Sequence, residues 1–111
     1  MKKLLLICFI LTINLFSAQT RGKATFYHDK FEGRKTASGD IFTQSKLTCA
    51  STTYKIGTKL KITNPKNRKS VICEVNDKGN LDINHIDLSK SAFRKIGNLN
   101  SGFLKILIEK I

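Results

Sequence analysis

The stretch from Lys59 to Val75 reads KLKITNPKNRKSVICEV, and it decides the fold class. Two runs in it, 59–63 and 70–75, are rich in apolar and β-branched residues, as is typical of strands with one buried face. Between them, Asn64-Pro65-Lys66-Asn67 has the composition of a tight turn. We therefore predict a β-hairpin.

Further short runs of the same kind lie on both sides of this hairpin. They predict strands of about five to seven residues at 23–27, 46–50 and 103–109. One segment, 89–96, has its apolar residues at helical spacing, with Ser89 or Asp87 as N-cap and Gly97 at the C′ position. Many short strands and one short helix bury a core most economically as a small mainly-β barrel, closed or half-closed.

The N-terminus has the features of a secretory signal peptide. Met-Lys-Lys is followed by an apolar run from Leu4 to Phe16 and by Ser17-Ala18. We predict a signal peptide at 1–18 and a single domain at 19–111, exported to the periplasm or the extracellular space without a stable membrane anchor. The alternative is a retained anchor, but this run is short for a membrane span and contains Thr12 and Asn14.

Two cysteines, Cys49 and Cys73, remain after the predicted cleavage, and both lie in apolar, strand-like surroundings. In an oxidising compartment this predicts a disulfide, the alternative being two buried free thiols. Together with His28 and His85 they have none of the spacings of a zinc motif, so we expect no metal site and no cofactor.

The net charge of the chain is +12 at pH 7. Without Lys2 and Lys3, 18 basic residues (20 minus 2) face 8 acidic ones, which gives +10. A field of this sign favours an anionic partner. Because the protein is predicted to be exported, we expect this partner in the cell wall and not a nucleic acid. The alternative is that the positive charge only keeps the protein soluble and has no specific partner. We expect a monomer.

A series of motifs runs through nearly the whole predicted domain. In order they are GKATFY at 22–27, FEGRKTASGDIF at 31–42, LTCAS at 47–51, GTKLKITN at 57–64, VNDKG at 75–79 and IDLS at 86–89. Their order and spacing resemble the rare lipoprotein A (RlpA) family. The resemblance covers 22–111 and implies a six-stranded double-psi β-barrel that acts on peptidoglycan glycan strands as a lytic transglycosylase.

That activity needs only one acid/base carboxyl, because the C6 hydroxyl of N-acetylmuramic acid attacks its own C1 and closes a 1,6-anhydro ring. Such a carboxyl works best with a pKa raised by partial burial. The first candidate is Asp77, which follows the predicted strand 71–75 and matches a family position. The alternative is that Asp77 only stabilises the Lys78-Gly79 turn. Asp40, where the family usually has glutamate, is the second.

Two family positions are not kept. Thr43 stands where the family usually has an aspartate and Ser51 where it has a histidine. Hydroxyls still hydrogen-bond sugars, so these changes favour glycan binding over proton transfer. The expected substrate-binding residues are Tyr27, Arg34, Thr43, Ser51 and Lys78, with Phe31, Phe42 and Tyr54 as further candidates for stacking on sugar rings.

The leading hypothesis is therefore a peptidoglycan lytic transglycosylase with Asp77 as acid/base and Asp40 assisting. The runner-up is a non-catalytic, expansin-like module that binds or loosens wall glycan. A third reading is a secreted inhibitor or effector built on the same barrel. We interpret Asp87, in the IDLS motif, as structural, capping the helix or bracing a crossing loop.

Overall fold

The computed structural model describes residues 18–111, so the predicted signal peptide, apart from Ala18, lies outside the described residues. Within 18–111, no helix is long and apolar enough to cross a membrane. The strands are β1 (Thr20–Phe26), β2 (Thr48–Ala50), β3 (Lys59–Thr63), β4 (Ser70–Asp77), β5 (His85–Leu88) and β6 (Leu104–Lys110). One α-helix, α2 (Lys90–Ile96), and two 3-10 turns, η1 (Asp29–Phe31) and η2 (Leu99–Ser101), complete the elements.

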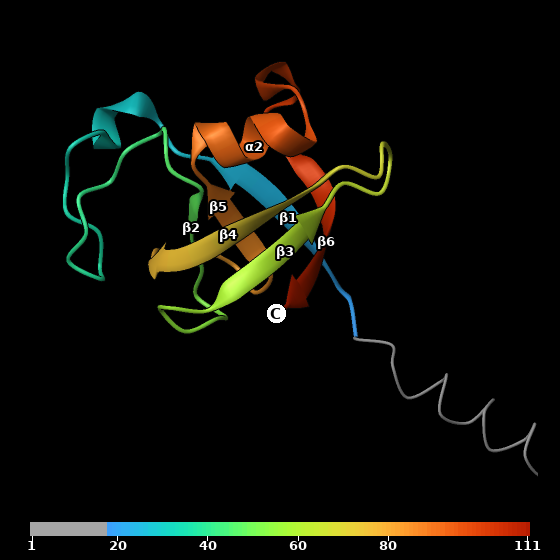
Figure 1. The fold of residues 1–111 in the computed structure, drawn as a ribbon, viewed down its shortest axis with the longest axis horizontal. Helices are drawn as coiled ribbons and strands as arrows, with labels where there is room; N and C mark the ends of the chain where they lie inside the picture. Colours follow the sequence, from blue (N-terminus) through green and yellow to red (C-terminus); the bar gives the residue numbers. More distant parts are fainter. Residues whose placement is uncertain (1–17) are drawn as a thin grey trace, which may run out of the picture.

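The six strands close into a barrel in the order β1-β5-β2-β4-β3-β6, with β6 returning to β1 (Figure 1). The β1–β5 and β2–β4 pairs are parallel, and the other four pairs are antiparallel. The parallel pairs require the chain to cross between non-neighbouring strands, as in a double-psi β-barrel. This confirms the predicted fold class, including the hairpin of β3 and β4.

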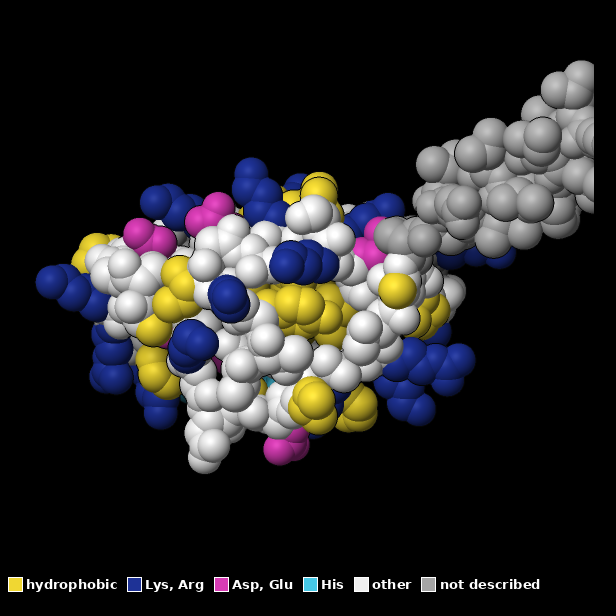
Figure 2. All heavy atoms as spheres, turned by 90° about the horizontal axis from the view of Figure 1, so that it is seen from below, with side chains coloured by type: hydrophobic (Ala, Val, Ile, Leu, Met, Phe, Trp, Pro, Cys, Tyr) yellow, Lys and Arg dark blue, Asp and Glu magenta, His cyan; other side chains and the backbone are white. Residues whose placement is uncertain are grey.

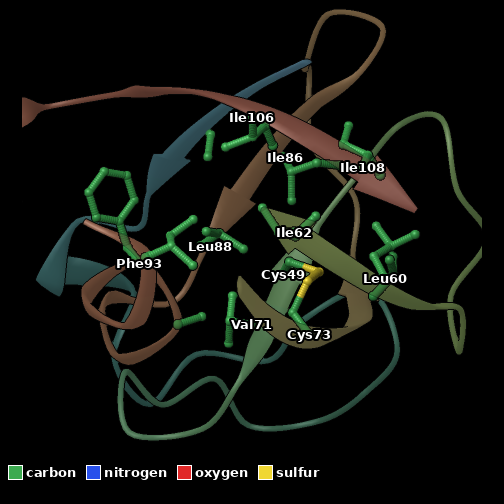
Figure 3. Packing of buried hydrophobic residues seen from close by; sticks show 14 residues of the cluster. Cys49, Leu60, Ile62, Val71, Cys73, Ile86, Leu88, Phe93, Ile106 and Ile108 are labelled. Carbon is green, nitrogen blue, oxygen red and sulfur yellow. A yellow bond between two sulfur atoms is a disulfide. The ribbon is translucent and has the colours of Figure 1, made fainter. Parts of the chain in front are cut away.

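The barrel interior is filled by side chains that alternate inward along the strands (Figure 3). Leu60 and Ile62 of β3 and Val71 of β4 are buried there, which explains the pattern of the 59–75 stretch. The predicted disulfide is confirmed: Cys49 of β2 and Cys73 of β4 are both fully buried, with Cα atoms 5.9 Å apart. Closing a loop of 24 residues stabilises the fold by about 3 kcal/mol on a chain-entropy estimate.

Helix α2 lies across one end of the barrel (Figure 1). Ser89 is its N-cap and accepts a hydrogen bond from the Ala92 N–H at 3.3 Å, so Asp87 does not have the capping role considered for it. Phe93 meets Phe26 edge to face at 4.9 Å between ring centres. Gly97 corrects an expectation, because it is an extended C-cap (φ −173°) and not a left-handed C′ residue.

Strand β5 and the 3-10 turns η1 and η2 were not predicted from the sequence. Strand β5 has only four residues, and the turn before it contains Asn84 at φ 59°. The segment between η1 and β2 has no regular strand and projects from the barrel near the end of β4 (Figure 1). Backbone hydrogen bonds such as Ser38 N–H to the Asn76 carbonyl (3.1 Å) attach this segment to β4.

Candidate active site at the barrel rim

The ends of β4 and β5 place two carboxylates on either side of β2. Ala50 of β2 pairs with Asp77 of β4 and, on its other edge, with Asp87 of β5. Two strand spacings separate the two aspartate Cα atoms, which corresponds to about 10 Å. We call the cluster of Thr25, Tyr27, Asp77, His85 and Asp87 the rim site.

Asp77 is half-buried and accepts three hydrogen bonds. The Tyr27 hydroxyl donates to its Oδ2 at 2.6 Å, and the backbone N–H groups of Ala37 and Lys78 donate to its Oδ1 at 2.9 Å each. The bond from Lys78 is the local turn contact considered for this residue. The bonds from Tyr27 and Ala37 come from 50 and 40 residues away, so Asp77 also joins distant segments at the rim.

Tyr27 orients Asp77 and is not an exposed stacking platform. Its side chain is only 6% exposed, and its ring stacks on the buried Phe42 at 4.2 Å between ring centres. Burial, followed by the hydrogen bond to Asp77 and the charges of Asp77 and Asp87, raises the pKa of the Tyr27 hydroxyl. The hydroxyl therefore stays protonated and remains a donor to Asp77. The expectation that Tyr27 and Phe42 stack on sugars is wrong for these buried rings.

Asp87 is the functional candidate that the sequence reasoning missed. Its Oδ1 accepts a hydrogen bond from the Thr25 hydroxyl at 2.8 Å, and Thr25 Oγ1 also lies 2.7 Å from His85 Nε2. Burial raises the pKa of the Asp87 carboxyl; the Thr25 bond and the His85 charge act against this rise, and the Asp77 charge adds to it. The place of Asp87, three residues before Lys90, the first residue of α2, favours a structural role in capping the helix or bracing a crossing loop, but Ser89 is the N-cap.

Asp40 and Thr43 lie in a second feature, a groove of about 540 Å³ beside β4. We call it the outer groove; its polar lining includes Asp40, Thr43, Lys46, Glu74 and Asn76. Asp40 Oδ2 lies 3.5 Å from Asn76 Nδ2, and no hydrogen bond joins Asp40 to Asp77 within 18–111. The structure thus places the second catalytic candidate in a different group of side chains from the first.

The remaining sequence candidates have varied surroundings. Ser51 is fully buried, and its hydroxyl accepts the N–H groups of Thr53 and Tyr54 at 3.0 Å each, so here its role is to stabilise a turn. Arg34 is exposed, with its guanidinium 5.5 Å from the centre of the Phe31 ring. Lys78 is exposed next to Asp77.

Among the described residues, no group of three or more His, Cys, Asp or Glu side chains is arranged to hold a metal ion.

Comparison with known proteins supports both the fold and the family. A family model described as lytic transglycolase matches residues 19–108. The endolytic peptidoglycan transglycosylase RlpA of Pasteurella multocida is 42% identical over 91 residues, which are 81% of this chain and 31% of that protein. The chain thus spans about a third of the length of this curated relative.

Solved structures match the same barrel. A mutant expansin of Clavibacter michiganensis, in complex with cellohexaose, superposes with a TM-score of 0.66 at 25% identity, over 85% of this chain and 50% of that one. A Streptomyces papain inhibitor gives a TM-score of 0.70 at 24% identity, over 85% of this chain and 94% of that one. The latter likeness is one of fold alone.

Proposed function

Because the chain belongs to the lytic transglycolase family, we propose that it cleaves peptidoglycan glycan strands at the rim site and leaves 1,6-anhydro ends. The observation that carries this proposal is the pair of carboxyl groups, Asp77 and Asp87, on either side of Ala50. Homologues named as endolytic peptidoglycan transglycosylases support the substrate class.

The two carboxyl groups differ in what they offer to the reaction. Asp77 accepts hydrogen bonds at both oxygens, from Tyr27, Ala37 and Lys78, so its carboxyl group is held in one orientation. Asp87 accepts one side-chain hydrogen bond, at Oδ1, and its raised pKa means that it keeps a proton to higher pH. We therefore assign the acid/base role to Asp87, in place of Asp77, which the sequence favoured for it.

In this mechanism the proton of Asp87 passes to the leaving O4 of N-acetylglucosamine as the bond from C1 of N-acetylmuramic acid breaks. The C6 hydroxyl of the same muramic acid then attacks C1, and its proton returns to Asp87. The Asp77 carboxylate stabilises positive charge that develops at C1 in the transition state. No water enters the reaction, because the nucleophile is already part of the substrate.

The positive surface supports delivery to the wall. Figure 2 shows lysine and arginine side chains across one face and along its edges, with fewer acidic side chains among them. The acidic groups of peptide stems and wall polymers complement this charge. We also propose export through the signal peptide at 1–18, which the buried disulfide supports because such bonds persist in oxidising compartments.

Digestion of purified peptidoglycan in water enriched in ¹⁸O, followed by mass spectrometry, tests the proposal. We expect muropeptides with 1,6-anhydromuramic ends that carry no ¹⁸O. Reducing ends labelled with ¹⁸O would instead identify a hydrolase and contradict the mechanism. Intact glycan that co-sediments with the protein would contradict cleavage and favour the second candidate.

That second candidate is a non-catalytic wall-binding module of the expansin kind. The likeness to an expansin in complex with cellohexaose favours it, as do Thr43 and Ser51 in place of the family's usual acidic and histidine side chains. The third reading, a secreted inhibitor or effector, rests on the high charge and small size of the domain, and the papain inhibitor shares the fold alone.

A further inference from the structure

Three side chains form a continuous row of hydrogen bonds on the outer face of β1 and β5. Thr25 of β1 pairs with Asp87 of β5, and His85 lies two residues before Asp87 on the same strand. Because alternate residues of a strand point to the same face, these three side chains share the face opposite to the buried Ala24 and Ile86. Thr25 Oγ1 lies 2.8 Å from Asp87 Oδ1 and 2.7 Å from His85 Nε2. The hydroxyl therefore lies between the carboxyl and the imidazole.

The Thr25 hydroxyl has a single proton, so it donates to only one of its two neighbours at a time. When the Asp87 carboxyl is ionised it has no proton to give, and it accepts the proton of Thr25. His85 Nε2 must then carry a hydrogen and donate it to Thr25 Oγ1, because a bare ring nitrogen at 2.7 Å would set one lone pair against another. The row thus has one direction, from His85 through Thr25 to the ionised Asp87.

The two oxygens of the Asp87 carboxyl have different surroundings. Oδ1 accepts from Thr25, whereas Oδ2 has no hydrogen-bond partner within 18–111. Among the described residues that are not exposed, Asn76 Oδ1 is the single buried side-chain oxygen or nitrogen without a partner, so Asp87 Oδ2 must be in contact with solvent. The carboxyl is therefore anchored at one oxygen and open at the other.

We propose that His85 is a positioning residue for the acid/base carboxyl: its Nε2–H holds the Thr25 hydroxyl toward Asp87 Oδ1, so that the proton is given and taken back at Oδ2. The inference rests on the proposed function, because it concerns the same carboxyl. When Oδ2 gives its proton to the leaving O4, the two donated hydrogen bonds stabilise the negative charge that develops on Asp87. The proton of the C6 hydroxyl then returns to Oδ2, and Thr25 and His85 keep their own protons throughout.

The neighbouring charged groups do not take part in the row. Lys23 pairs with His85 across β1 and β5, and Asp77 lies beyond β2. Within 18–111, neither forms a hydrogen bond or an ion pair with His85 or Asp87. The backbone of His85 is held independently of its ring, because its N–H donates to the Asp82 carbonyl at 3.1 Å. Replacing the imidazole should therefore leave β5 in place.

NMR of the ring nitrogens of His85 tests the arrangement in the intact protein without any cleavage. The spectra are recorded at a pH at which the ¹³C signal of the Asp87 carboxyl shows that it is ionised. We expect Nε2 to carry a hydrogen with a downfield, hydrogen-bonded signal in the wild type and in Thr25→Ser. In Thr25→Val, which lacks the hydroxyl, this signal should move upfield. A bare Nε2 in the wild type, or a signal unchanged by Thr25→Val, would overturn the proposal.

Rates of anhydro-product formation separate positioning from packing. His85→Leu should lower kcat about tenfold, because the Thr25 hydroxyl is no longer held toward Asp87. His85→Gln, which keeps an N–H donor at about the place of Nε2, should recover most of this loss. The matched control is His28→Asn at the other histidine, which is exposed and outside the rim site; it keeps an acceptor for the Lys30 N–H and should have the wild-type rate.

The outcomes distinguish this inference from the proposed function. Equal rates in His85→Leu and His28→Asn, or a His85→Gln variant as slow as His85→Leu, would overturn the positioning role. The expected NMR signals without anhydro products from the wild type would contradict the proposed function alone. Anhydro products together with a bare Nε2 would contradict this inference alone, and that measurement needs no variant to fold.

Discussion

At the scale of single residues, the Tyr27 hydroxyl holds the Asp77 carboxylate from the barrel wall. Tyr27→Phe removes this hydrogen bond and keeps the ring that stacks on Phe42. We expect the rate of anhydro-product formation to fall about tenfold or more, since a hydrogen bond to a charged group contributes roughly 1.5–3 kcal/mol. KM should change little, because Tyr27 is almost inaccessible to substrate. Steady-state kinetics on soluble glycan strands measure both values, and an unchanged kcat would rule out the positioning role.

The ionised side chain of Asp87 should lower the free energy of unfolding at neutral pH. Because burial raises its pKa in the folded state, the folded protein binds its proton more tightly than the unfolded chain does. The free energy of unfolding should therefore fall as pH rises from the ordinary value of 3.8 through the raised value. Asp87→Asn keeps an acceptor for Thr25 and removes the buried charge, so its Tm should exceed that of the wild type at pH 7.

The same comparison has an internal control in acid. Below the ordinary pKa, Asp87 is protonated in both the folded and the unfolded protein, so the two Tm values should converge. Thermal unfolding of both proteins from pH 3 to pH 8 measures the difference. A gap that stays constant over this range would contradict the raised pKa.

The sequence predicted part of the site and not its arrangement. Asp77 was identifiable because it follows an apolar strand within a family motif. Its contacts were not, since they depend on side chains 50 and 40 residues away. Asp87 was missed because a short polar residue before a helix is a typical cap, and only the structure shows that Ser89 fills that position. Its raised pKa results from burial, which the local sequence does not encode.

At the scale of elements, β1 passes so close to the turn before β5 that it requires glycine at one point. A Cβ on Gly22 would collide with the backbone carbonyl oxygen of Asn84 and lie 2.7 Å from Ile108 Cδ1. The backbone atom cannot rotate away, so Gly22→Ala should destabilise the protein by about 2–4 kcal/mol. Gly79→Ala is the matched control, because its Cβ would meet only Leu81 at an ordinary 3.5 Å.

Chemical denaturation of the two glycine variants measures the difference. We expect a clear drop in the denaturant midpoint for Gly22→Ala and a change within about 0.5 kcal/mol for Gly79→Ala. Equal effects would mean that the close approach of β1 to Asn84 does not constrain the barrel.

The elements with strong local patterns were predictable, and those defined by distant pairing were not. The β3–β4 hairpin follows from alternation and a proline-containing turn, and α2 from its apolar spacing and its Ser89 cap. Strand β5 is too short to have a clear period, and its parallel partner β1 lies about sixty residues earlier in the chain. The number of strands and their crossing came from the family resemblance, because local periodicity does not encode strand order.

At the scale of the whole molecule, positive charge should govern the encounter with the wall. With 20 basic and 8 acidic residues in the full chain, attraction to anionic wall groups is screened by salt. We expect the fraction that co-sediments with purified sacculi to fall several-fold when NaCl is raised from about 50 to about 500 mM. Binding that is insensitive to salt would show that shape and hydrogen bonds, not charge, determine the association.

Strand β4 contributes residues to both the rim site and the outer groove. Its end carries Asp77 to the rim site, and the residue before it carries Asn76 to the outer groove. The disulfide from Cys73 to β2 and the hairpin with β3 fix this strand in the core.

The rate at which 1,6-anhydromuramic ends form, measured for the wild type, Asp87→Asn and Asp77→Asn on the same glycan strands, tests the rim carboxyl pair most directly. We expect the wild type to form these ends and Asp87→Asn to be slower by about 10²–10⁴-fold, the usual contribution of a general acid. Asp77→Asn should be slower as well, with the fold retained in both variants by circular dichroism. Wild-type rates in Asp87→Asn would contradict the assignment of Asp87 as the acid/base.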